Sequence, residues 1–122
     1  MESNLLISSI AWAISGIIIK LVCLYSQKNI GKPNLLIGYK TPRSLASQEN
    51  WEILNKVFFA RFSKIVPYIF ISAVALLFLS YINISNQTVI ITLSVAPILI
   101  ILAPVLQTFL QEESILKNNQ HV

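Results

Sequence analysis

The residues best suited to chemistry lie together in one short segment, residues 34–44, with the sequence NLLIGYKTPRS. Two cations, Lys40 and Arg43, stand there beside the hydroxyl groups of Thr41 and Ser44. Cations and hydroxyls grouped in this way can hold an anion, such as a lipid phosphate or the carboxylates of a partner protein. The simpler interpretation is an ordinary loop, because glycine and proline are the usual residues of turns.

Gly38 and Pro42 restrict the backbone that would present these groups. Gly38 permits a positive φ angle or a close approach of another chain segment. Pro42 fixes its own φ and pushes Thr41 toward an extended conformation. An ordered loop and a plain turn-rich connection both remain open at this point.

The chain lacks the residues that some kinds of metal binding and catalysis require. There is one cysteine, Cys23, one histidine, His121, and no aspartate. A metal cage rich in Cys or His therefore has no set of ligands within one chain, and a Ser-His-Asp triad has no Asp. We expect a protein that is not an enzyme, with no metal and no cofactor.

The composition indicates a membrane protein. Hydrophobic residues make up 55% of the chain and charged residues 11%, whereas soluble domains average about 25% charged residues. Residues 5–25 are apolar apart from Lys20, and at about 1.5 Å per residue they span a bilayer core of about 30 Å. Residues 65–111 carry no charge, which is too long for one span and suits two. The polar patch at 83–87 divides them into helices at 65–82 and 88–110.

The distribution of Lys and Arg predicts the orientation of these helices. Seven of the nine lie between Lys28 and Lys64. By the positive-inside rule the loop 26–64 faces the cytosol of a bacterial inner membrane, with the N-terminus outside and the tail 111–122 inside. We expect contacts with membrane lipids and no direct contact with nucleic acid, because the basic residues are not part of a soluble DNA-binding motif.

The second part of the loop, residues 48–64, reads as an amphipathic helix. Ser47 is a suitable N-cap and Glu49 lies in the first turn. Apolar residues recur every three or four positions, which favours a helix at the membrane interface that continues into the second span with Pro67 as a bend. These apolar positions are Trp51, Leu54, Phe58, Phe62 and Ile65. The predicted fold is thus a single all-α integral membrane domain, 1–122, with three transmembrane helices and one interfacial helix.

Pro97 and Pro104 fall inside the predicted third span. Each removes one backbone donor, which leaves carbonyls near Leu93 and Ile100 to be satisfied by neighbours or water. We expect a kinked helix packed on the other two, with a hinge or ligand groove as the alternative.

The loop resembles the hallmark of the SdpI family of bacterial membrane proteins. That hallmark has the form Asn-x-x-Ile-Gly-(aromatic or aliphatic)-Arg-Thr-Pro, then Ser, then Trp-x-x-x-Asn, between the first and second of three membrane helices. One departure is that Lys40 stands where the family usually has Arg, so the bidentate guanidinium fork is lost unless Arg43 replaces it. The matching run is Asn34-x-x-Ile37-Gly38-Tyr39-Lys40-Thr41-Pro42-x-Ser44, followed by Trp51 and Asn55.

The resemblance implies a role in immunity. The family protects bacterial cells from a secreted killing peptide and couples toxin sensing to a cytosolic repressor, without catalysis. Trp51 can also be read as an interfacial anchor, and Asn55 as a hydrogen-bonding partner of the loop that carries Gly38. The candidate binding residues are Asn34, Gly38, Tyr39, Lys40, Thr41, Pro42, Arg43, Trp51 and Asn55.

Other functions are weaker alternatives. A small accessory subunit of a larger bacterial membrane complex, with other membrane subunits as partners, is the closest of them. Transport is disfavoured because no carboxylate lies within the predicted spans to relay protons. An enzyme of lipid chemistry is disfavoured because Ser and Thr lack an activating His or Asp.

Overall fold

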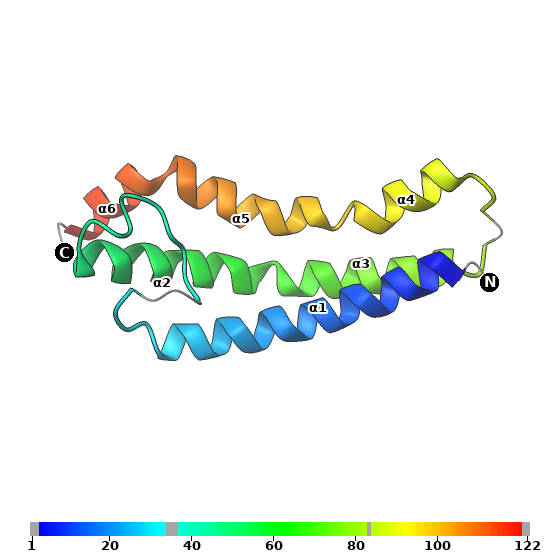
Figure 1. Cartoon of the computed structure of the whole chain (residues 1–122), viewed down its shortest axis with the longest axis horizontal. Coiled ribbons are helices and arrows are strands. Elements are labelled where there is room, and N and C mark those ends of the chain that lie inside the picture. The colour runs from blue at the N-terminus through cyan, green and yellow to red at the C-terminus, as the bar shows by residue number, and fades with distance from the viewer. Residues whose placement is uncertain (1–2, 34–36, 83, 121–122) are drawn as a thin grey trace.

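The computed structural model describes residues 3–33, 37–82 and 84–120, and within them the chain forms helices without strands. The long helices run side by side along the molecule (Figure 1). The elements in order are α1 (Ser3–Lys28), α2 (Gln48–Lys64), α3 (Val66–Leu79), α4 (Gln87–Val95), α5 (Ile98–Leu110) and α6 (Glu112–Gln120).

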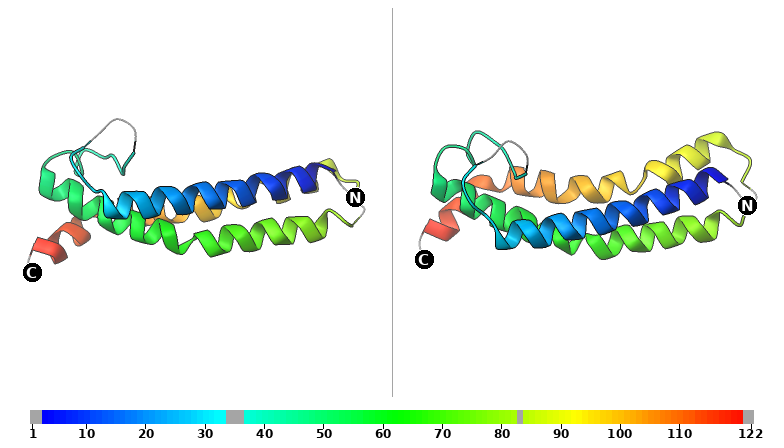
Figure 2. Two further views of the ribbon diagram at one scale, coloured as in Figure 1. Left: turned by 90° about the horizontal axis from the view of Figure 1, so that it is seen from below. Right: turned by 60° about the horizontal axis from the view of Figure 1, so that its bottom comes forward.

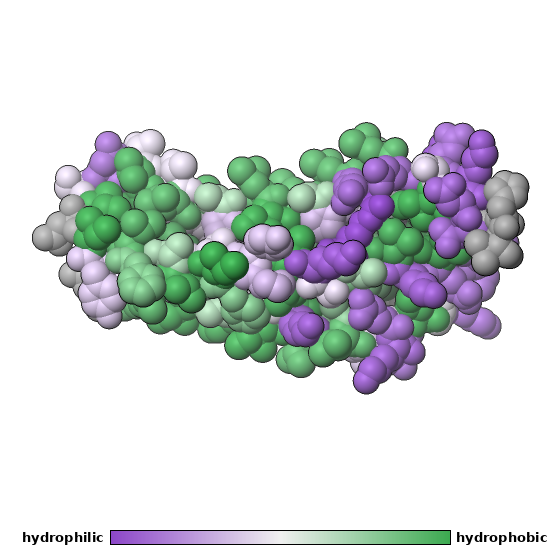
Figure 3. All heavy atoms as spheres, turned by 180° about the vertical axis from the view of Figure 1, so that it is seen from behind, coloured by the Kyte–Doolittle hydropathy of each residue, from purple (hydrophilic) through white to green (hydrophobic). Residues whose placement is uncertain are grey.

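Three helical stretches are long and apolar enough to cross a membrane. They are Ser3–Lys28, Gln48–Leu79 and Gln87–Leu110, which agrees with the three spans expected from the sequence. The first is longer than predicted at both ends, and the second ends at Leu79 rather than at 82. Hydrophobic residues cover most of the face seen in Figure 3, and hydrophilic ones gather at the end that holds α2, the loop and α6.

Small residues on α1 allow it to approach α3 closely. Gly16 is buried, and a Cβ placed there would lie only 3.0 Å from the ring of Phe70. About two turns nearer the N-terminus, the hydroxyl of Ser9 donates to the Ala73 carbonyl across 2.6 Å. Interhelical contacts of small and hydroxyl residues of this kind are typical of membrane helix pairs.

The predicted third helix is interrupted, which corrects the expectation of one helix over 88–110. A turn at Ala96 and Pro97 separates α4 from α5, and Pro104 remains inside α5. The indole N–H of Trp12 donates to the Ser94 carbonyl at 2.8 Å. A neighbouring helix thus satisfies a carbonyl freed near the proline, one residue from the expected position.

Helices α2 and α3 form nearly one rod (Figures 1 and 2). The break falls at Ile65, which accepts the backbone N–H groups of Tyr68 and Ile69, and Pro67 stands in the first turn of α3. The predicted N-cap is confirmed, because the Ser47 hydroxyl accepts the Asn50 N–H at 3.0 Å. A helix at 48–64 is therefore present, and its position at a membrane interface stays a prediction.

The C-terminal tail, for which no helix was predicted, contains helix α6. Its Ile115 and Leu116 are buried against Leu54 of α2 and Tyr39 of the loop, and this forms a small apolar core. Figure 2 shows α6 at the same end of the molecule as the loop. The tail therefore packs on the segment that holds the candidate residues.

Candidate functional site

Gly38 allows the loop to lie directly on α2. Its φ is +139°, a conformation that residues with a side chain rarely adopt. A Cβ at this position would overlap the Trp51 ring, 2.8 Å from Cζ2, and would lie 3.1 Å from Oδ1 of Asn55. The position therefore requires glycine for two independent reasons, backbone conformation and space.

Asn55 holds the backbone of the next residue from both sides. Its Oδ1 accepts the Tyr39 N–H at 2.6 Å, and its Nδ2 donates to the Tyr39 carbonyl at 3.3 Å. Nδ2 also donates to the Trp51 carbonyl at 2.9 Å, one turn earlier on α2. The prediction that Asn55 bonds the loop is confirmed. Trp51 is 2% exposed and covers Gly38, so its interpretation as an interfacial anchor is wrong.

Thr41 and Ser44 close a tight turn around Pro42. The Thr41 N–H donates to Oγ of Ser44 at 2.8 Å, and this Oγ donates to the Thr41 carbonyl at 3.0 Å. The Ser44 N–H donates in turn to Oγ1 of Thr41 at 3.2 Å. Because Ser44 is fully buried, its hydroxyl stabilises the loop itself. An incoming ligand therefore does not meet the Ser44 hydroxyl.

The loop hydroxyls bind a carboxylate that belongs to the chain itself. Oε1 of Glu112 accepts hydrogen bonds from the Tyr39 phenol at 2.5 Å and from the Thr41 hydroxyl at 2.6 Å. Glu112 is the first residue of α6 and is 4% exposed. A carboxylate at a helix N-terminus is further favoured by the helix dipole. We call the three residues Tyr39, Thr41 and Glu112 the loop–tail contact.

The surroundings of Tyr39 keep its phenol protonated. Burial raises the pKa of Tyr39 above its ordinary value, and the hydrogen bond to the Glu112 carboxylate and its negative charge raise it further. The Tyr39 ring also packs on Phe58 with ring centroids 5.1 Å apart. The phenol is therefore held as a hydrogen-bond donor at neutral pH.

The remaining candidates are less constrained. Lys40, Pro42 and Arg43 are exposed, and Arg43 forms a long ion pair of 3.9 Å with the exposed Glu113. Such exposed pairs contribute little to stability. Asn34 lies outside the described residues. The expected grouping of cations and hydroxyls is thus divided, with hydroxyls turned inward and cations left at the surface.

Glu112 is the residue that the sequence analysis missed. It stands next to a second Glu in a polar tail and reads as a counter-charge to Lys117. A usable signal was present, because Glu112 and Glu113 precede the apolar pair Ile115 and Leu116, as expected for the first turn of a helix with a buried face. Among the described residues, no group of three or more His, Cys, Asp or Glu side chains could hold a metal ion.

Comparison with known proteins gives one finding. A family model described as the SdpI/YfhL protein family matches residues 31–108. The match includes the loop from Gly31 onward and α2, and it ends four residues before Glu112. Neither the curated proteins nor the solved structures give a match.

Proposed function

Because the chain belongs to the SdpI/YfhL protein family, we propose that it is a non-enzymatic immunity or signalling protein. It protects a bacterial cell against a membrane-active toxin peptide or senses that peptide. The observation that carries this proposal is the convergence of the family hallmark on one ordered unit. Gly38, Tyr39, Thr41, Trp51 and Asn55 all contact one another or the tail there.

The arrangement of this unit favours signalling over catalysis. The hydroxyls of Tyr39 and Thr41 and the side-chain amide of Asn55 are paired with partners within the protein, as in a scaffold that holds one conformation. A catalytic group would need an approachable nucleophile or base, whereas the carboxylate of Glu112 is buried and bound by two donors. The exposed cations Lys40 and Arg43 lie next to this unit and suit the acidic surface of a cytosolic partner, such as a repressor.

The positions of the ends fit the proposed orientation. The loop and the C-terminus lie at one end of the rod and the N-terminus at the other (Figure 1). If the basic loop faces the cytosol of the bacterial inner membrane, α6 does so too, and the N-terminus is outside. A toxin would then meet the apolar helices within the membrane, and the loop and α6 would report its arrival inside the cell.

Co-purification tests this proposal against the alternative of an accessory subunit. The chain carries a tag after residue 122, native membranes are extracted in mild detergent, and every associated protein is identified. We expect the chain alone, or with a small peptide or a repressor-like protein. Recovery in fixed ratio with a large membrane assembly would instead identify a subunit of that assembly.

A further inference from the structure

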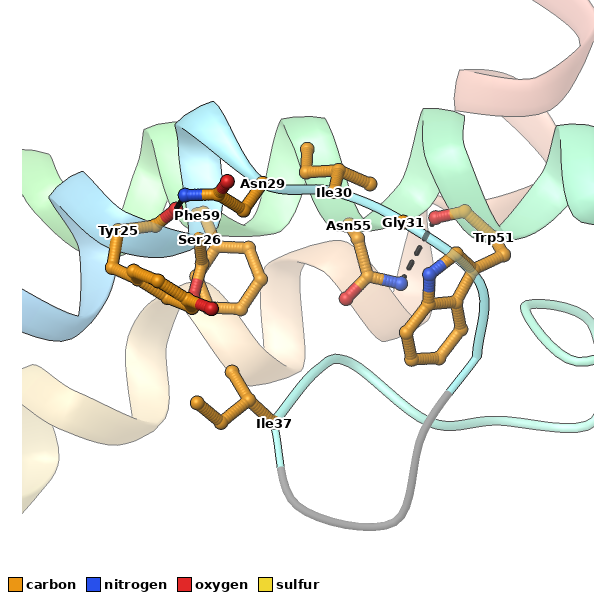
Figure 4. A pocket seen from close by; sticks show the side chains of 9 residues that line it. All are labelled: Tyr25, Ser26, Asn29, Ile30, Gly31, Ile37, Trp51, Asn55 and Phe59. Carbon is orange, nitrogen blue, oxygen red and sulfur yellow. Dashed lines mark hydrogen bonds between the residues drawn. The ribbon is translucent and has the colours of Figure 1, made fainter.

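Two neighbouring cavities lie between α1, the loop and α2. The first, of about 260 Å³, is lined by Tyr25, Ser26, Asn29, Ile37, Trp51 and Phe59 among others (Figure 4). The second, of about 370 Å³, is lined by aliphatic and aromatic residues that include Ile18, Ile19, Val22, Phe58 and Phe62. Ile37 and Phe59 line both cavities, so the two adjoin.

The first cavity holds an unpaired polar group. Ser26 is 4% exposed, and among the described residues its hydroxyl is the buried side-chain group that has no hydrogen-bond partner. A buried hydroxyl without a partner is costly, and such a group in a binding cavity is suited to a ligand that supplies the missing bond. The Asn29 amide lies in the same wall and donates its own N–H to the Tyr25 carbonyl at 2.9 Å.

The two cavities differ in polarity along α1. The residues of the second cavity on α1 lie about one to two turns before Ser26, which is about 4.5–12 Å along the helix axis at 1.5 Å per residue. They are Ile18, Ile19, Val22 and Cys23. The path from Ser26 to these residues therefore leads from the C-terminal end of α1 toward the middle of the first apolar span. None of the described residues that line either cavity is charged.

From this geometry we propose that the paired cavities bind one lipid with an uncharged, hydrogen-bonding head and a single hydrocarbon chain, of the monoacylglycerol type. A head hydroxyl or ester oxygen bonds the hydroxyl of Ser26, and the chain lies along Ile18, Ile19 and Val22. An anionic head is excluded because no described cation lines the first cavity to offset the loss of its hydration. The inference does not depend on the proposed immunity role.

Photolabelling tests the site directly. The full chain is placed in phosphatidylcholine nanodiscs with a monoacylglycerol that carries a diazirine in its chain, and labelled residues are mapped by mass spectrometry. We expect labels at residues of the second cavity and their displacement by unlabelled monoacylglycerol. Labels spread over the exposed faces of all helices, without displacement, would overturn the proposal.

Two pairs of variants locate the head and the chain. Ser26→Ala is expected to weaken labelling about 2- to 10-fold, the worth of one hydrogen bond. Without the lipid this variant is expected to be at least as stable as the unaltered chain, because it removes an unpaired hydroxyl. Ser15→Ala serves as the control, because the Ser15 hydroxyl already donates to the Ala11 carbonyl on the same helix.

Val22→Phe places a larger side chain in the second cavity and is expected to abolish labelling there. Leu21→Phe is its control and is expected to leave labelling unchanged, because Leu21 does not line this cavity.

Three results would contradict the assignment. Equal labelling of Ser26→Ala and Ser15→Ala would exclude the head position. Equal labelling of Val22→Phe and Leu21→Phe would exclude the chain position. A diazirine fatty acid with an ionised carboxylate that labels the cavity as well as the monoacylglycerol does would overturn the uncharged head.

Discussion

The phenolic oxygen of Tyr39 lies 2.5 Å from a carboxylate oxygen of Glu112, although 73 positions separate them in sequence. The contact joins the loop that carries the family hallmark to a helix beyond the matched region. Both residues are buried, so the bond is shielded from water and from salt. It provides a direct means by which a change in the loop would reach the C-terminal helix.

Removal of the phenolic hydroxyl should release α6. Tyr39→Phe keeps the ring that packs on Phe58 and removes one of the two donors to Glu112. We expect a loss of about 1.5–3 kcal/mol in the free energy of unfolding, because the lost bond involves a charged acceptor. Thermal unfolding in detergent measures this loss, and faster hydrogen exchange in α6 locates it. Tyr81→Phe, at an exposed position, is the control, and an equal effect of the two variants would refute the prediction.

The two adjacent glutamates should behave differently. Glu112→Gln removes the charge that strengthens both hydrogen bonds, and we expect a loss of about 1–3 kcal/mol in the free energy of unfolding. Glu113→Gln alters a residue whose side chain is 85% exposed and that has only the long ion pair with Arg43, so we expect no measurable change. Chemical unfolding of both variants side by side is the measurement. Similar values for the pair would mean that the buried carboxylate is not important.

The glycines offer a second matched pair. Gly38→Ala places a Cβ against Trp51 in a backbone with φ of +139°, and we expect a loss of at least about 1–3 kcal/mol in the free energy of unfolding. Gly31→Ala meets nothing within 4 Å and should be neutral or slightly stabilising. Thermal unfolding, together with the fluorescence of the buried Trp51, distinguishes the two. A Gly38→Ala variant with unaltered stability would show that the loop does not lie on Trp51.

The pH dependence of stability follows from Tyr39. Its raised pKa means that the folded protein holds the phenolic proton more tightly than the unfolded chain does, where the ordinary value is 10.0. This contribution to stability is therefore fully present below about pH 10, and it is lost as the pH rises from there through the raised folded-state pKa. A tyrosinate absorbance titration should show that one of the four tyrosines ionises last. Tyr39→Phe should remove that last step, and removal of an earlier step instead would contradict the assignment.

The sequence predicted the features that depend on local pattern. The charge-free run 65–111 predicted two of the spans, and the seven Lys and Arg residues between Lys28 and Lys64 predicted the loop between the first and second. The spacing of four between Trp51 and Asn55 placed both on one face of a helix beside the loop, which the hydrogen bonds of Asn55 confirm. Ser47 was likewise recognisable as an N-cap from its type and position.

The features that were missed depend on contacts between distant segments. Nothing near Glu112 in the sequence indicates that its partners are Tyr39 and Thr41, because the pairing arises only when α6 packs on α2. Hydroxyls and cations in the loop suggested an external anion, whereas the carboxylate that the hydroxyls bind belongs to the tail. The interruption at Pro97 was also underestimated, since proline is tolerated within membrane helices and the choice between kink and break depends on neighbours such as Trp12.

Survival under toxin tests the proposed role in immunity most directly. A sensitive bacterial strain expresses the chain, Gly38→Ala, Glu112→Gln or their controls Gly31→Ala and Glu113→Gln at matched membrane levels, and is challenged with a purified membrane-active killing peptide of bacterial origin. If the chain has this role, we expect that the unaltered chain and both controls raise survival, and that Gly38→Ala and Glu112→Gln do not. Absence of protection by the unaltered chain, or full protection by Gly38→Ala and Glu112→Gln, would contradict it.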